Sequence, residues 1–178
     1  MRAALDWLYR ASGALAGVFL VLIAVMTLAQ IGGRLLGIAA RSFDDFAGFC
    51  MAASFFLGLA ATLRAGEHIR VSLLLHGLSA GKRRAMELLC LAVSLFLCAY
   101  FAWYSIDMTW TSHTLNDVSQ GLVGVPLWIP QSGMALGLIA LAIALADDLL
   151  AVIRGVRPSY EIAEEEKAKA GAVPSFER

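Results

Sequence analysis

The chain has 178 residues, of which 60% are hydrophobic and only 16% are charged. Average soluble domains are about 45–50% apolar and about 25% charged, and a soluble fold of this size could not bury so much apolar surface. The formal net charge is zero, so there is no basic excess of the kind that a nucleic-acid-binding protein shows. The totals predict a membrane protein, because lipid accepts exposed apolar side chains.

Four stretches without a charged residue are long enough to cross a membrane. About 20 helical residues span a hydrocarbon core of about 30 Å. Pro126 and Pro130 mark the start of the last helix, because proline fits a first turn whose N–H groups have no intrahelical partner. We therefore predict an all-α integral membrane fold with spans at about residues 11–33, 46–63, 88–106 and 127–146.

Basic residues are distributed unevenly between the two sides that four spans create. The segment before the first span, the loop between the second and third spans, and the C-terminal tail together hold all but two of them. The exceptions, Arg34 and Arg41, lie between the first and second spans. Because basic loops remain in the cytoplasm, we expect both chain ends to be cytoplasmic and the polar third loop, 107–125, to lie outside.

The second loop contains a short amphipathic pattern. Its apolar residues recur at i, i+3, i+4 and i+7, which predicts an interfacial helix at about 69–79 lying flat on the membrane. Either lipid or a partner subunit could cover its apolar face. The basic residues that follow are expected to meet anionic lipid headgroups; they are Lys82, Arg83 and Arg84. The membrane domain should cover 1–157, followed by a flexible, at most partly helical tail, 158–178.

Ionisable side chains are absent from all four apolar runs. Such a group costs roughly 2.5–3.5 kcal/mol at the bilayer centre, and proteins accept that cost at functional sites. The three cysteines show neither metal-ligand nor redox spacing. We therefore expect no catalytic residue, cofactor or metal, and an auxiliary role within a larger membrane complex. The alternatives are a membrane-embedded enzyme and a stand-alone small exporter, which would both need such a group.

Several charged residues at the span ends invite local explanations. Glu67 is spaced for an i, i+3 ion pair with Arg64 or with Arg70, and His68 lies between them without a partner for a metal site. Ser42 with Asp44 and Asp45 reads as the capping box of the second span, where acidic residues favour the helix N-terminus.

Asp147 and Asp148 oppose the dipole of the last span if that helix ends beside them. One explanation is that the helix continues through Val152 and Ile153. The other is that the two acids pair with Arg64 or with the basic residues at 82–84. The sequence leaves both explanations open.

Three motifs occur in order along these spans. The acidic pair Asp44-Asp45 opens the second span, Arg64-Ala-Gly-Glu-His68-Ile-Arg-Val71 closes it, and Pro126-Leu-Trp128-Ile-Pro130 opens the fourth. Over about residues 5–157 the chain resembles the small, DctQ-like permease subunit of tripartite ATP-independent periplasmic (TRAP) transporters. One departure is Ser72, where that family often has Asp, so an ion pair made by that Asp is missing here.

The resemblance implies a role in the bacterial inner membrane. A large multi-span subunit would carry the sodium and substrate sites, a periplasmic binding protein would deliver an organic acid, and this chain would scaffold the large subunit and help to dock the binding protein. Small residues on its helices would allow close approach of that partner. The expected partner contacts are Asp44, Asp45, Gly58, Arg64, Glu67, His68, Arg70, Pro126, Trp128, Pro130, Gly133 and Gly137.

Overall fold

All four apolar runs lie within long helices of the computed structural model, which describes residues 2–38, 42–67 and 79–169. Four of its helices are long and apolar enough to cross a membrane, which confirms the predicted all-α fold with four spans. The predicted interfacial helix at 69–79 lies outside the described residues, apart from Ser79. The helices are α1 (Arg2–Leu35), α2 (Phe43–Arg64), α4 (Ala80–Thr114), α5 (Trp128–Ile153) and α6 (Ser159–Lys169).

Two of these helices are longer than a bilayer requires. α1 has 34 residues and α4 has 35, so each extends about 50 Å, compared with a hydrocarbon core of about 30 Å. α4 continues past its apolar run to Thr114, which corrects the expectation that the third loop begins at Asp107. A helix can continue into water or headgroups because its backbone hydrogen bonds are internal.

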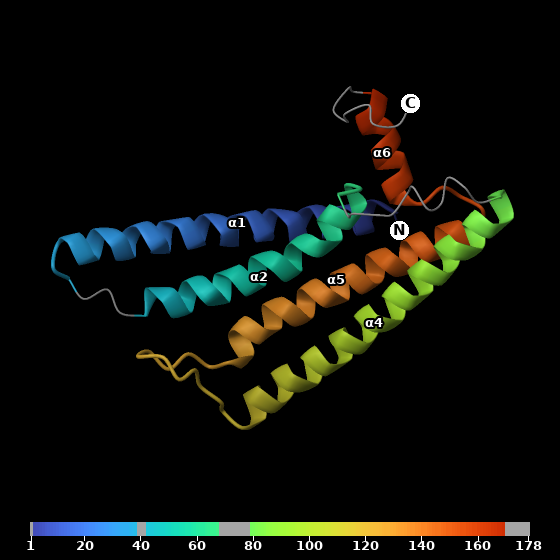
Figure 1. Cartoon of the computed structure of the whole chain (residues 1–178). Coiled ribbons are helices and arrows are strands. Elements are labelled where there is room, and N and C mark those ends of the chain that lie inside the picture. The colour runs from blue at the N-terminus through green and yellow to red at the C-terminus, as the bar shows by residue number, and fades with distance from the viewer. Residues whose placement is uncertain (1, 39–41, 68–78, 170–178) are drawn as a thin grey trace.

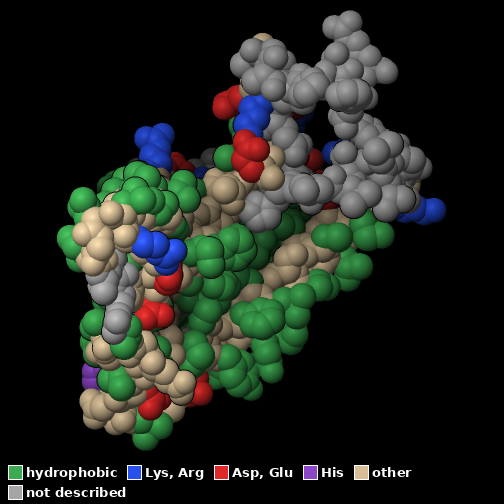
Figure 2. Space-filling view, turned by 60° about the vertical axis from the view of Figure 1, so that its left-hand side comes forward, with side chains coloured by type: hydrophobic (Ala, Val, Ile, Leu, Met, Phe, Trp, Pro, Cys, Tyr) green, Lys and Arg blue, Asp and Glu red, His purple; other side chains and the backbone are tan. Residues whose placement is uncertain are grey.

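The four long helices stand in a row in the order α1, α2, α5, α4 (Figure 1). α2 and α5 occupy the middle of the row, and α1 and α4 form its edges. Burial follows this order, since 39% of the apolar stretch of α5 is buried but only 6% of that of α1. The row is open, and hydrophobic side chains cover much of the face in Figure 2.

The start of α1 and the end of α5 lie at the same end of the row, beside α6 (Figure 1). We call this the α6 end. The end of α1, the start of α2 and the 115–127 connection between α4 and α5 lie at the opposite end, which we call the hairpin end. An even number of spans requires this arrangement, and the cytoplasmic location of the α6 end remains a prediction.

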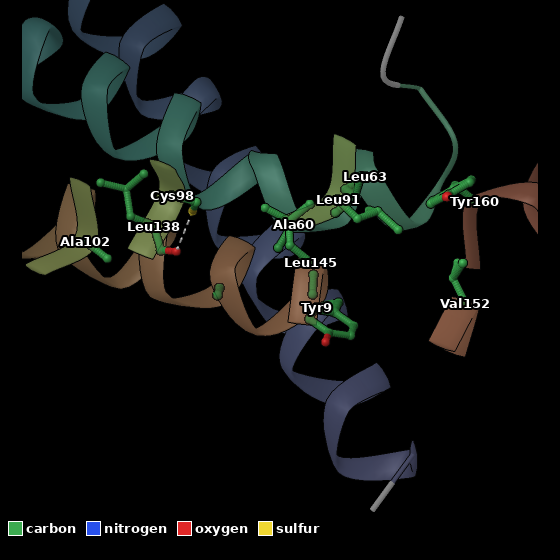
Figure 3. Close-up of a cluster of buried hydrophobic side chains, with 12 residues drawn as sticks. Tyr9, Ala60, Leu63, Leu91, Cys98, Ala102, Leu138, Leu145, Val152 and Tyr160 are labelled. Atoms are coloured by element: carbon green, nitrogen blue, oxygen red, sulfur yellow. Dashed lines mark hydrogen bonds between the residues drawn. The ribbon is translucent and has the colours of Figure 1, made fainter. Parts of the chain in front are cut away.

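The buried core connects α1, α2, α4, α5 and α6 (Figure 3). Small side chains allow the central helices to approach closely, and Ala60 and Ala144 are completely buried. The Cys98 thiol donates to the Leu138 carbonyl at 3.4 Å, joining α4 to α5 (Figure 3). The cysteines of the described chain are free thiols.

Residues 159–169 belong to the tail, which was expected to be flexible and at most partly helical. These residues form α6, and Tyr160 is only 3% exposed within the same core as the spans (Figure 3). The polar composition of this segment concealed one aromatic anchor and two charges with distant partners, since Glu161 pairs with Arg83 of α4 and Lys167 pairs with Glu67, which follows α2.

Candidate functional site

Arg64, at the end of α2, joins three helices at the α6 end. Its guanidinium lies 2.6 Å from an Asp6 carboxylate oxygen on α1 and 3.2 Å from an Asp147 oxygen on α5. It also lies over the Tyr9 ring, 4.8 Å from the centroid. The arginine side chain is 24% exposed and Tyr9 is only 3% exposed, so the cluster is partly shielded from solvent. It positions α2 between its two neighbours.

The Arg64–Asp147 pair confirms one explanation for the acidic residues of α5, and the helix also continues to Ile153 as the other proposed. The expected local pair between Arg64 and Glu67 is wrong, because Arg64 turns to α1 and α5. Glu67 instead accepts from the Lys167 ammonium of α6. His68 and Arg70 lie outside the described residues.

Asp148 is the most buried charged side chain of the described chain, at 1% exposure. Its carboxylate accepts two hydrogen bonds from Ser159, one from the backbone N–H at 2.8 Å and one from the hydroxyl at 2.9 Å. Asp148 therefore holds the first residue of α6 to the last turns of α5. A carboxylate near a helix N-terminus also complements the helix dipole.

The basic residues at the start of α4 were expected to face lipid headgroups, but two of them contact this chain. Arg84 donates to the Val152 and Ile153 carbonyls at 3.1 and 3.0 Å. It thereby satisfies acceptors at the α5 C-terminus, where a cation is favourable. Arg83 lies 3.3 Å from Glu161 of α6. Lys82 is exposed and has no ion pair among the described residues, so a headgroup contact remains a prediction for it.

At the hairpin end, Asp44 and Asp45 do not form the predicted capping box. Ser42 has a left-handed backbone with φ of 80°, and its hydroxyl makes no cap hydrogen bond, because capping requires an extended N-cap conformation. Asp44 instead accepts from the Gln30 amide of α1 at 2.8 Å. The Asp45 carboxylate lies against Gly121 of the 115–127 connection.

That connection forms a small hairpin, closed by the bridge between Val118 and Pro126. Ser119 N–H donates to the Val125 carbonyl at 2.8 Å, and Leu127 N–H donates to the Asp117 carbonyl at 2.9 Å. Residues 117–127 therefore form a defined surface, which we call the hairpin.

The motif after the hairpin begins α5. Trp128 is the first residue of the helix and Pro130 lies in its first turn, as the sequence predicted. Trp128 packs edge-on against His113, which stacks on Trp110. Pro126, Trp128 and Pro130 thus fix where α4, the hairpin and α5 meet.

The small residues expected at the partner interface make their close contacts within this chain. A Cβ on Gly137 would collide with the backbone of Phe56 and lie 2.8 Å from the Leu57 nitrogen. A Cβ on Gly133 would lie 3.2 Å from that of Ala53, and one on Gly58 would lie 3.7 Å from that of Ala16. Close approach was expected, but the approaching helices belong to the same polypeptide.

Sequence reasoning did not identify several residues that build the α6 end. Asp6 and Tyr9 were missed as partners of Arg64, and Ser159 and Tyr160 were missed because the tail was expected to be flexible. The sequence does contain a signal for this helix. A serine follows Pro158 and an acidic residue falls in the first turn, at Glu161, which is the pattern of a helix start.

The described residues contain no group of three or more His, Cys, Asp or Glu side chains that could hold a metal ion. The polar contacts described above join helices to each other. These contacts therefore hold a row of apolar helices at fixed positions.

Comparison with protein-family models finds a match over residues 23–155 to the DctQ component of tripartite ATP-independent periplasmic transporters. This match covers the last 13 residues of α1 and all of α2, α4, the hairpin and α5, and it ends two residues after α5. Neither the curated proteins nor the solved structures include a match to the chain. The chain therefore belongs to the DctQ component family of TRAP transporters.

Proposed function

We propose that this chain is the small membrane subunit that braces the large transport subunit of a TRAP system. In this proposal the system imports an organic acid by using a sodium gradient across the bacterial inner membrane, and both ends of this chain are cytoplasmic. The family match carries the proposal. The open row of helices supports it, because a row with exposed apolar faces can enlarge the wall of a neighbouring protein.

The exposed face of α4 is the contact that we propose for the large subunit. Tyr100 is 52% exposed, and its hydroxyl makes no hydrogen bond with a described residue. It lies six residues, or about 9 Å, inside the apolar run that ends at Ile106. Helical side chains tilt toward the N-terminus of their helix, so this hydroxyl points deeper still. Lipid tails cannot pair with it, whereas a polar group on a partner helix can.

The exposed face of α1, at the other edge of the row, has a different composition. It is aliphatic, and lipid accommodates aliphatic side chains without an unsatisfied polar group. Its most exposed members in the apolar run are Leu15, Val18, Leu20, Val21, Val25, Leu28 and Ile31. We therefore propose that α1 faces lipid and α4 faces the partner.

Co-purification in mild detergent tests this placement. Replacing Tyr100 with Phe removes only the hydroxyl, and one interhelical hydrogen bond in a membrane contributes about 0.6 kcal/mol on average and at most about 1.7. The recovery of the large subunit should fall about 3- to 18-fold. Leu20→Ala on α1 is the matched control and should leave recovery unchanged. Loss of the partner with Leu20→Ala but not with Tyr100→Phe would reverse the assignment.

We also propose that the hairpin helps to dock the periplasmic binding protein. Leu122 and Val123 at its tip are 72% and 51% exposed, and an apolar tip held by a closed turn suits a transient protein contact. Leu122→Ser should raise the concentration of binding protein that gives half-maximal uptake, with little change in the maximal rate. An unchanged concentration would remove the hairpin from the docking surface.

Reconstitution into liposomes distinguishes this function from the alternatives. With the large subunit and binding protein present, sodium-dependent uptake of an organic acid is expected, and uptake should fail when this chain is omitted. Concentrative transport by this chain alone would establish a stand-alone exporter or importer instead. Catalytic turnover by the purified chain would support a membrane-embedded enzyme.

A further inference from the structure

We infer that α6 is a strap that locks the position of the α1–α2 pair relative to the α4–α5 pair at the α6 end. This inference is independent of the proposed function. α6 follows residue 155, where the family match ends, so the strap is an addition to the part of the chain that the family model describes.

The two helix pairs meet chiefly where α2 packs against α5 (Figure 1). This contact is close at Gly133 and Gly137, which lie against Ala53 and the backbone of Phe56. α1 and α4 lie on opposite sides of it, at the two edges of the row. Two bodies that touch along one line can rotate about that line unless a second tie lies away from it.

α6 supplies such a tie because it contacts both pairs. Its Lys167 donates to Glu67, directly after α2. Its Glu161 accepts from Arg83 of α4 at 3.3 Å. The ends of α2 and α4 are therefore linked through one helix of 11 residues.

The start of α6 is anchored more firmly than its end. Asp148 of α5 accepts from both the N–H and the hydroxyl of Ser159. Tyr160 belongs to the core cluster that contains Leu63 and Val152 (Figure 3). The ion pair of Lys167 with Glu67, near the other end of α6, involves side chains that are 34% and 61% exposed, so salt screens it. The strap is therefore held by a buried anchor at one end and by a salt-sensitive contact at the other.

Chemical cross-linking tests whether the strap is closed. Cysteines are placed by Glu67→Cys and Lys167→Cys in a full-length chain whose three native cysteines are replaced by Ala, and a short thiol cross-linker is added. We expect efficient cross-linking, a loss of at least fivefold on adding Tyr160→Ala, and no loss on adding Ile162→Ala, which alters an exposed residue of α6. Equal cross-linking with Tyr160→Ala would show that the anchor does not hold the strap.

Spin-label distances test whether the strap locks the helix pairs. Labels at Ala65 and Lys82 report the separation of the α2 and α4 ends. Truncation after Arg157 removes α6 and should broaden and shift the distance distribution, whereas truncation after Lys169 should not. An unchanged distribution after removal of α6 would overturn the inference. If the shorter chain fails to fold, Lys167→Glu should broaden the distribution and Glu67→Lys in the same chain should restore it; failure of both effects would likewise overturn it.

Discussion

The two ends of this row of helices are held together by different chemistry. At the α6 end, charged side chains join helices that are far apart in the sequence, as in the contacts of Arg64 with Asp6 and Asp147. At the hairpin end, the contacts include one amide–carboxylate hydrogen bond, a closed turn and the packing of His113 between Trp110 and Trp128.

The difference follows from where the basic residues lie. The distribution that predicts which loops are cytoplasmic also places arginines and lysines at the α6 end, where carboxylates of α1, α5 and α6 meet them. The hairpin carries no basic residue, so its geometry depends on backbone hydrogen bonds, proline and aromatic packing. We expect the α6 end to respond to charge and salt and the hairpin end to respond to packing.

The largest effect on stability should come from the contact of α5 with α2 at Gly137. This contact lies between the two ends of the row, so its loss should affect both ends. Gly137→Ala would push α5 away from the backbone of Phe56, and overpacking of a core costs about 1–3 kcal/mol. The loss of stability should be near the upper limit, because backbone cannot move aside as a side chain can. Gly48→Ala of α2, where a Cβ meets no atom within 4 Å, is the matched control. Thermal unfolding in detergent measures both, and equal midpoints would contradict the close contact.

Arg64→Gln should have the next largest effect, and it should be confined to the α6 end. It removes two ion pairs and one cation–π contact, each contributing up to about 1 kcal/mol for partly exposed groups, so a loss of about 1–3 kcal/mol is expected. Arg157→Gln, which breaks only the pair with Glu165 at 2.6 Å, should cost less than about 1 kcal/mol. Hydrogen exchange should increase near Tyr9 and remain unchanged in the hairpin; exchange that also increased in the hairpin would show that the ends are coupled.

Asp148→Asn should weaken the attachment of α6 while preserving the size of the side chain. Hydrogen bonds to a charged group contribute about 1.5–3 kcal/mol each, and neutral ones contribute about 1. Burial disfavours the charged form of Asp148, which offsets part of this difference, so a net loss of about 1–2 kcal/mol is expected. Limited proteolysis between Arg157 and Lys169 should become faster. Asp147→Asn is the control, since it should leave the rate of cleavage there unchanged.

The smallest effect on stability should come from the hairpin tip. Leu122→Ser changes a side chain that is 72% exposed, so the free energy of unfolding should change by less than about 0.5 kcal/mol. Trp128→Ala, which removes the contact with His113, should cost more. If both variants were equally destabilising, the tip would be packed against something that this chain alone does not supply.

The sequence was sufficient for the elements whose cause is local. The length of the stretches without a charged residue predicted the four spans. The position of Pro130 predicted the start of α5 to within a residue or two. It also suggested Arg64 as a partner of Asp147, because a basic and an acidic residue at the same membrane boundary have few other ways to pair.

The sequence was less informative where the outcome depended on which helices become neighbours. The Ser42 pattern looked like a capping box, but the turn before α2 adopts a left-handed conformation. Gly133 and Gly137 marked a close approach correctly, but the sequence could not say whether the approaching helix was foreign or α2.

By itself, the sequence determined that this protein is a four-span helical membrane protein, because hydrophobicity and helix length act through each segment separately. Only the tertiary structure decided that the helices form an open row, that Asp148 holds α6, and that Arg64 contacts Asp6 instead of Glu67. Such outcomes depend on which distant residues become neighbours, as Arg64 and Asp6 do although they are 58 positions apart, and no local pattern in the sequence fixes that.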